Sequence, residues 1–115
     1  MSRKVTVIGA GNVGSTIAYT LSLGTIASQI VLIDINKDKA EGEVMDIVQG
    51  ASFREPITVV AGDYEDARDS DIVVITSGMG RKPGQSRIDL AQTNVNIIKD
   101  IATQIAPVCP NALYV

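Results

Sequence analysis

The sequence predicts an α/β domain with a doubly wound parallel sheet, and three features of the chain lead to this fold class. Short apolar runs of strand length alternate with longer helical patterns along the 115 residues. The run 71–76 contains four consecutive β-branched residues without polar alternation, which is typical of a parallel strand buried on both faces. A glycine-rich turn joins the first strand to the first helix. Strands connected through helices in this way lie parallel, with right-handed crossovers.

Each element has its own signal in the sequence. We expect strands at 5–8, 30–33, 57–61, 71–76 and 112–115, helices at 15–23, 37–48 and 88–106, and a loop or one short helical turn between 62 and 71. Asn36 is a suitable N-cap for the second helix and Gly50 ends it, while Pro107 and Pro110 stop the last helix. The expected strand order is 3-2-1-4-5. This is a Rossmann-type sheet that lacks a sixth strand and a catalytic domain, so we expect residues 1–115 to be one dinucleotide-binding domain from a longer enzyme.

The turn after the first strand carries a phosphate-binding pattern. Gly9, Gly11 and Gly14 follow the spacing G-x-G-x-x-G. In this pattern one glycine allows a tight turn, a second lets a pyrophosphate approach the backbone, and a third lets the helix pack closely. The helix N-terminus then attracts the phosphates. Asp34 ends the next strand, where a carboxylate accepts hydrogen bonds from ribose hydroxyls and repels a 2′-phosphate. These residues predict NAD as the cofactor, in preference to NADP.

Composition excludes several other classes of function. The net charge is −3 with 20% charged residues, so we expect no nucleic-acid or membrane partner. We expect a cytoplasmic protein, because the first residues lead directly into a strand without a signal-peptide core. Cys109 is the one cysteine and there is no histidine, so we expect no metal site and no internal disulfide. Without histidine, the chain alone lacks the usual proton carrier for a coupled hydride transfer.

A second small-residue turn follows the strand at 71–76, at the sheet edge where ligands bind in such folds. The loop after it, 81–87, places three cations around a Pro-Gly pair. Such a loop can close over a bound anion, although surface solubility is the simpler explanation for its charges.

Together, these motifs and the run RKPGQSRIDLAQTNVNI resemble the N-terminal half of the L-lactate and malate dehydrogenase family, over the whole chain. The resemblance implies hydride transfer between NAD(H) and a small 2-hydroxy or 2-keto acid by the complete protein, which we expect to be a homo-oligomer. It implies a catalytic role for Arg87, which would polarise the substrate carbonyl. The cofactor-binding residues that it implies are Gly9, Gly11, Asn12, Val13, Gly14, Asp34, Tyr64, Thr76, Ser77, Gly78 and Asn94.

The resemblance leaves the substrate open between malate and lactate. Arg81 matches the position that contacts the distal end of the substrate, where malate dehydrogenases usually carry arginine and lactate dehydrogenases typically carry glutamine, although some lactate-like members also carry arginine. A guanidinium pairs with a second carboxylate, which favours oxaloacetate and malate. The G-D-Y segment and the run N-V-N-I-I-K are more similar to lactate dehydrogenases, and Gln85 matches neither group. Two further alternatives are a non-catalytic NAD-binding module and a folding or assembly fragment.

Overall fold

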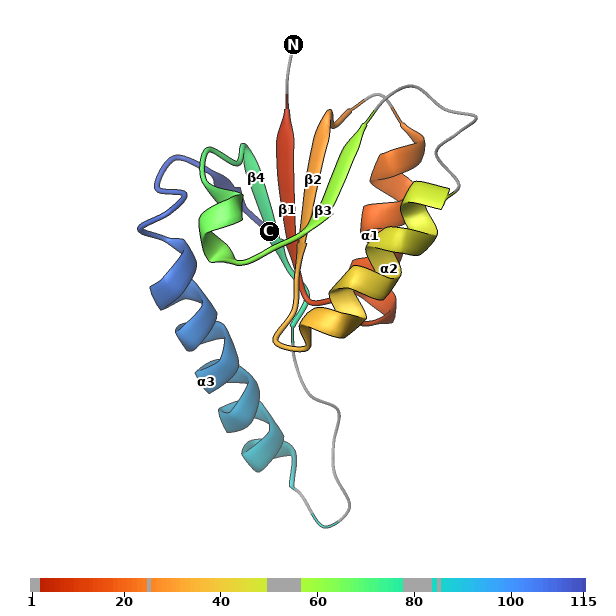
Figure 1. The fold of residues 1–115 in the computed structure, drawn as a ribbon. Helices are drawn as coiled ribbons and strands as arrows, with labels where there is room; N and C mark the ends of the chain where they lie inside the picture. Colours follow the sequence, from red (N-terminus) through yellow and green to blue (C-terminus); the bar gives the residue numbers. More distant parts are fainter. Residues whose placement is uncertain (1–2, 25, 50–56, 78–83, 85) are drawn as a thin grey trace.

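The computed structural model describes residues 3–24, 26–49, 57–77, 84 and 86–115. Within these residues, one parallel sheet has the order β3-β2-β1-β4-β5, which confirms the predicted fold class and strand order (Figure 1). Its strands are β1 (Lys4–Ile8), β2 (Gln29–Ile33), β3 (Thr58–Ala61), β4 (Ile72–Ile75) and β5 (Leu113–Tyr114). The helices are α1 (Asn12–Leu23), α2 (Lys37–Gln49) and α3 (Arg87–Ile105), and a 3-10 turn, η2 (Tyr64–Ala67), precedes β4.

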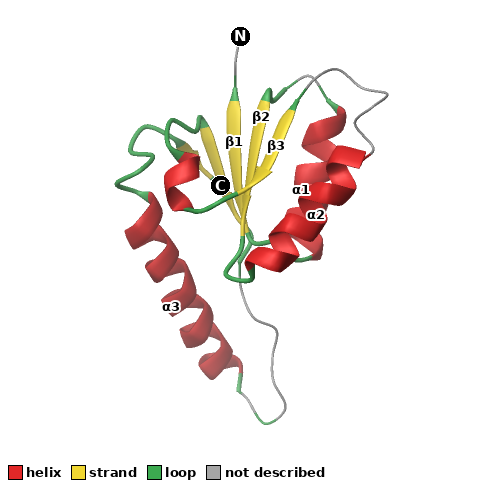
Figure 2. Cartoon of the chain, viewed as in Figure 1, coloured by secondary structure: helices red, strands yellow, loops and turns green. Residues whose placement is uncertain are grey.

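Helices cover both faces of the sheet. Figure 2 shows α1 and α2 on one side of the strands and α3 with the η2 turn on the other. Alternate residues of β1 point to the two layers: Val5 and Val7 pack in the core beneath α1 and α2, whereas Ile8 belongs to the core beneath α3. Strands β1 and β2 are therefore buried on both faces, as their apolar sequences require.

The prediction that the strand at 71–76 is buried on both faces was wrong in part. Val73 is fully buried against α3, but Ile72, Val74 and Ile75 remain half-buried. Ile72 and Val74 face the other layer, where α1 packs on β1 and β2, and α2 packs on β2 and β3. Ile75 lies at the edge of the core beneath α3. Strand β4 is therefore only partly covered on the side of α1 and α2.

The helix boundaries follow local capping chemistry. Helix α1 begins at Asn12, three residues before its predicted start, because Gly11 is already in extended conformation and forms the N-cap. The Asn36 side chain accepts the Lys39 N–H at 3.2 Å, which confirms the predicted cap of α2. Ser86 accepts the Asp89 N–H at 3.1 Å and starts α3. The predicted stop at Gly50 lies outside the described residues.

A buried polar cluster joins the η2 turn to the sheet and to the end of α3. The Thr6 and Ser70 hydroxyls lie 2.6 Å apart, and Ser70 donates to the Ala67 carbonyl at 2.6 Å. The Cys109 thiol donates to the same carbonyl at 2.9 Å. Cys109 is thus a core residue with a local partner. Among the described residues, no helix is long and apolar enough to cross a membrane.

Candidate cofactor site

The three motif glycines have three different environments, and each matches one requirement of a phosphate-binding turn. Gly9 has a positive φ of 113°, which a residue with a side chain rarely adopts. A Cβ on Gly14 would lie 1.7 Å from the Gly9 carbonyl oxygen, so only glycine lets α1 start against this turn. A Cβ on Gly11 would meet nothing within 4 Å. Gly11 therefore leaves open space in front of the helix N-terminus.

The start of α1 offers unpaired donors to that space. Its first turn contains no acidic residue, and no side chain caps the Gly11 position. The first N–H groups of a helix, here those of Asn12, Val13 and Gly14, have no partner within the helix. Together with the helix dipole they favour an anion. The open space at Gly11 and these donors fit the pyrophosphate of a dinucleotide.

Asp34 is held against the glycine turn by the fold. Its Oδ2 accepts the Ala10 N–H at 2.6 Å and its Oδ1 accepts the Asn36 N–H at 2.9 Å. The Gly9 N–H donates to the Ile33 carbonyl at 2.7 Å, so the ends of β1 and β2 are joined at the same place. Each carboxylate oxygen keeps acceptor capacity for a further donor, such as a ribose hydroxyl.

The residues that follow β4 support the turn from its other side. The Thr76 N–H donates to the Ile8 carbonyl at 2.9 Å, and the Thr76 hydroxyl lies 3.2 Å from the Ile8 and Gly9 carbonyl oxygens. Ser77 donates its hydroxyl to the Ile8 carbonyl at 3.2 Å. Both side chains thus fix the end of β1 and also border the cleft described next.

A cleft of ≈ 440 Å³ lies at the carboxyl edge of the sheet, where these elements meet. It is lined by Gly9, Gly11, Asp34, Ile35, Lys39, Thr76, Ser77 and Ile97. A second hollow of ≈ 250 Å³ shares Asp34, Ile35, Ser77 and Ile97 with it and extends to Tyr64, Asp100 and Gln104. The two form one continuous surface from the glycine turn to the η2 turn. This is the position at which open α/β sheets bind ligands.

Tyr64 borders the far end of this surface. Partial burial of its phenol raises its pKa above the ordinary value, and the negative charge of Asp100 raises the pKa further. The phenol therefore stays protonated near neutral pH and can donate a hydrogen bond. The side chains around it are largely apolar, including Ile8, Ile33 and Ile101, which suits a flat heterocycle.

Of the thirteen predicted site residues, six line this cleft or its extension: Gly9, Gly11, Asp34, Tyr64, Thr76 and Ser77. Asn12 borders a separate hollow between α1 and α2. Asn94 lies half-buried on α3 and borders a separate apolar surface with Val95 and Ile98, so its cofactor contact stays a prediction. Arg87 is the first residue of α3 and is exposed, at the end of the helix that projects beyond the sheet (Figure 1). Gly78, Arg81 and Gln85 lie outside the described residues.

Several cleft residues escaped prediction from the sequence. Ile35 directly follows Asp34 and is 98% exposed, which is unusual for isoleucine outside a binding surface. Ile97, Asp100 and Gln104 lie on the face of α3 that borders the cleft, and Lys39 borders it from α2. The helical spacing of the residues on α3 could be read from the sequence. The sequence does not show, however, that this face of α3 meets the ends of β1 and β2.

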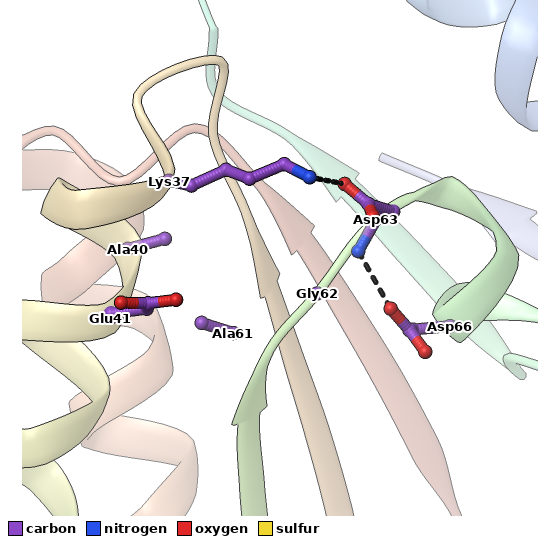
Figure 3. A pocket seen from close by; sticks show the side chains of 7 residues that line it. All are labelled: Lys37, Ala40, Glu41, Ala61, Gly62, Asp63 and Asp66. Carbon is purple, nitrogen blue, oxygen red and sulfur yellow. Dashed lines mark hydrogen bonds and ion pairs between the residues drawn. The ribbon is translucent and has the colours of Figure 1, made fainter.

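A smaller pocket of ≈ 190 Å³ lies between α2 and the turn after β3 (Figure 3). Lys37 pairs with Asp63 at 2.9 Å across it, and the Asp63 N–H donates to Asp66 Oδ2 at 2.7 Å. The hydrogen bond and charge of Asp63 raise the pKa of Lys37. None of the predicted cofactor residues lines this pocket. Its contacts fasten the start of α2 to β3.

Comparison with known proteins identifies the family of the chain. The family model for the lactate/malate dehydrogenase NAD binding domain matches residues 3–115. The chain belongs to this family. It is therefore an NAD-binding domain of the lactate and malate dehydrogenases, and the predicted fold, family and cofactor are confirmed.

Relatives of both enzyme types resemble this NAD-binding domain. An L-lactate dehydrogenase of Thermoanaerobacter sp. is 51% identical over 111 residues, 96% of this chain and 36% of the relative. Among solved structures, the minor L-lactate dehydrogenase of Enterococcus mundtii has a TM-score of 0.93 at 38% identity, covering 98% of this chain and 36% of that one. Malate dehydrogenase of Archaeoglobus fulgidus in complex with NADH has a TM-score of 0.87 at 42% identity, covering 96% of this chain and 38% of that one. The chain thus spans about a third of the length of the curated relatives it matches.

Proposed function

We propose that this chain is the cofactor-binding part of an NAD-dependent oxidoreductase that interconverts a small 2-hydroxy acid and its 2-keto acid. The observation that carries the proposal is the contact between the Ala10 N–H and Asp34 Oδ2 at 2.6 Å. It joins the phosphate-binding turn to the ribose-binding carboxylate in one rigid unit. Bound NAD would supply the hydride acceptor, and the side chains and backbone of the protein would bind and orient the cofactor and the substrate.

The residues of the chain have separate tasks in this proposal. Gly9, Gly11 and the first turn of α1, at Asn12, Val13 and Gly14, would hold the pyrophosphate, and Asp34 the adenosine ribose. Tyr64 would border the adenine. Thr76, Ser77 and Gly78 would direct the nicotinamide end toward the substrate, with Asn94 touching the cofactor from α3. Arg87 would polarise the substrate carbonyl and stabilise the negative charge that develops on its oxygen.

Titration with NADH tests the cofactor part of the proposal. We expect saturable NADH fluorescence changes, weaker binding of NADPH, and an affinity for NADH that falls roughly tenfold or more in Asp34→Ala, since a hydrogen bond to a charged group contributes about 1.5–3 kcal/mol. Asp46→Ala is the matched control, because Asp46 is an exposed carboxylate on α2 outside the dinucleotide cleft. Equal affinity for NADH and NADPH in the folded native protein would contradict the role of Asp34.

Two substrates are supported by different observations. Arg81 favours oxaloacetate and malate, since its guanidinium would form a bidentate pair with a second carboxylate. The several L-lactate dehydrogenases at 46–51% identity favour pyruvate and lactate as the second candidate. Arg81→Gln in the complete enzyme separates them. A loss of selectivity for oxaloacetate over pyruvate, measured as the ratio of kcat/KM values, supports malate; an unchanged ratio would refute the role of Arg81.

We further propose a cytoplasmic homo-oligomer, and the outer surface of α1 and α2 supports the oligomeric part. Tyr19, Leu23, Met45 and Val48 expose about half or more of their surface there. Apolar side chains gathered on one exposed layer are typical of subunit contacts. Light scattering of the complete protein gives the mass directly, and a monomer at micromolar concentration would contradict this proposal.

A further inference from the structure

The η2 turn lies between two hollows of the molecule. Tyr64, its first residue, borders the extension of the cofactor cleft. Asp66, two positions later, lines the smaller pocket between α2 and the turn after β3, and it is exposed (Figure 3). The proposed function uses Tyr64 and gives no task to Asp66. The contacts of Asp66 nevertheless join the two residues in one small structural unit.

Asp66 closes a ring with Asp63, the residue directly before Tyr64. The Asp63 N–H donates to Asp66 Oδ2 at 2.7 Å, and the Asp66 N–H donates to the Asp63 carbonyl at 3.0 Å (Figure 3). A carboxylate that returns to the N–H of the cap residue is one half of a capping box. The backbone on the N-terminal side of Tyr64 is therefore held by the carboxylate of Asp66.

The Asp66 side chain also occupies the space beside Gly62. A Cβ on Gly62 would lie 2.6 Å from Asp66 Oδ2 and 2.8 Å from Asp66 Cβ. The φ of Gly62 is outside the positive region, so space and not backbone conformation favours glycine here. Its N–H donates to the Leu32 carbonyl at 3.1 Å, which ties the same segment to β2. The missing side chain at Gly62 thus lets Asp66 reach the backbone before Tyr64.

The two ends of η2 are held in different ways. At the C-terminal end, the buried residue Ala67 accepts two hydrogen bonds from core side chains through its carbonyl. At the N-terminal end, Asp63 has its N–H on Asp66 and an exposed ion pair with Lys37 at 2.9 Å. An exposed ion pair contributes little to stability. The end that carries Tyr64 therefore relies on the Asp66 carboxylate and on the partial burial of its own ring.

We infer that Asp66 is a positioning residue for the adenine end of the cofactor site. Its carboxylate holds the Asp63 N–H and thereby fixes Tyr64 at the far end of the cleft, although Asp66 does not line the cleft itself. The inference rests on the proposed role of Tyr64 beside the adenine. When this contact is lost, Tyr64 is in place for only part of the time, and the affinity for the adenosine part of the cofactor falls by that fraction.

The ionisation of Tyr64 reports its position without any ligand. Partial burial and the charge of Asp100 raise the pKa of its phenol, and Asp34 is the other charged residue that lines the same hollow. In absorbance titrations of the complete protein at alkaline pH, subtracting the curve of the matching Tyr64→Phe variant isolates this phenol. In Asp66→Ala we expect the pKa of Tyr64 to fall toward its ordinary value, with the fold retained by circular dichroism.

Two controls separate the hydrogen bond from other effects. Asp66→Asn removes the same charge, but its amide oxygen can still accept the Asp63 N–H, so the pKa of Tyr64 should stay close to the native value. Glu65→Ala removes the neighbouring acid of the turn, which pairs with Arg68 at 2.9 Å, and should also leave the pKa of Tyr64 unchanged. An unchanged pKa in the folded Asp66→Ala protein, or equal shifts in Asp66→Ala and either control, would overturn the inference.

Calorimetric titration of the complete protein with 5′-AMP connects the position of Tyr64 to the cofactor site. We expect Asp66→Ala to lower the affinity about fivefold, equivalent to roughly 1 kcal/mol, and the two controls to change it less than about twofold. Gly62→Ala provides a second route, because the added methyl group displaces the Asp66 side chain without removing it. It should lower the affinity in the same way. Undiminished affinity in the folded Asp66→Ala and Gly62→Ala proteins would overturn the inference.

A parallel NADH titration separates this inference from the proposed function. If the native protein binds NADH, but folded Asp66→Ala keeps the native pKa of Tyr64 or the native affinity for 5′-AMP, the role of Asp66 is refuted while the NAD site stands. If the native protein binds neither NADH nor 5′-AMP, the proposed function itself fails, and the inference fails with it.

Discussion

Replacing Gly14 by alanine tests the closest contact in the cofactor site. The added Cβ would lie 1.7 Å from the Gly9 carbonyl oxygen and 2.8 Å from Thr76 Oγ1. The first of these partners is backbone, so no side-chain rotation relieves the overlap. Helix α1 must move away from the turn, and the hydrogen bond between the Thr76 hydroxyl and the Gly9 carbonyl at 3.2 Å would be disturbed.

The expected cost follows from three opposing contributions. Overpacking against a fixed backbone costs up to about 3 kcal/mol. A disturbed hydrogen bond adds about 1 kcal/mol. Alanine in a helix recovers roughly 1 kcal/mol relative to glycine. We therefore expect Gly14→Ala to lower the free energy of unfolding by ~3 kcal/mol, measured by urea denaturation followed by circular dichroism.

Gly11→Ala is the matched control, three positions away in the same motif. Gly11 has an ordinary φ of −74°, and a Cβ there meets nothing within 4 Å. The free energy of unfolding of Gly11→Ala should fall by only about 1 kcal/mol, the typical cost of placing alanine at an N-cap. NADH affinity should nevertheless fall, because the methyl group would occupy the space proposed for the pyrophosphate. Equal stabilities for the two variants would refute the packing argument, and undiminished NADH binding by Gly11→Ala would refute the assignment of that space.

Three further results are expected. In the complete enzyme, Arg87→Lys should reduce kcat, measured by stopped-flow kinetics, about a hundredfold, because the role proposed for Arg87 is to stabilise negative charge in the transition state. The affinity for NADH, measured by titration, should change little. The raised pKa of Tyr64 keeps its phenol protonated in the folded state after the unfolded phenol ionises. The contribution of Tyr64 to the free energy of unfolding is therefore fully present below the unfolded pKa of about 10 and is lost as the pH rises through the folded pKa. In denaturation series at alkaline pH, the free energy of unfolding should fall less steeply with pH in Tyr64→Phe than in the native protein. Ser70→Ala removes the partner 2.6 Å from the buried Thr6 hydroxyl. It should cost about 1–3 kcal/mol in urea denaturation, and the double variant with Thr6→Val should recover part of that loss.

Much of the fold could be predicted because its signals are local. The β-branched runs of β1 and β2, the glycine turn and the cap at Asn36 each depend on neighbouring residues, and all three appear in the structure. The start of α1 was placed late because Gly11 can serve as an N-cap without any side-chain signal. The burial of β4 was overestimated because it depends on which strands the distant helices cover.

The sequence by itself determined the fold class, the dinucleotide motif and the acid at the end of β2, since these depend on spacing along the chain. The tertiary structure alone decided how they meet: the Ala10 N–H on Asp34, the Cβ space at Gly11, and the face of α3 that borders the cleft. It also showed that Lys37 is paired and that Lys39 borders the cleft, although the two lysines lie two positions apart in the sequence. The physical reason is that hydrogen bonds and charge contacts between elements depend on packing across the sheet, which no local pattern encodes.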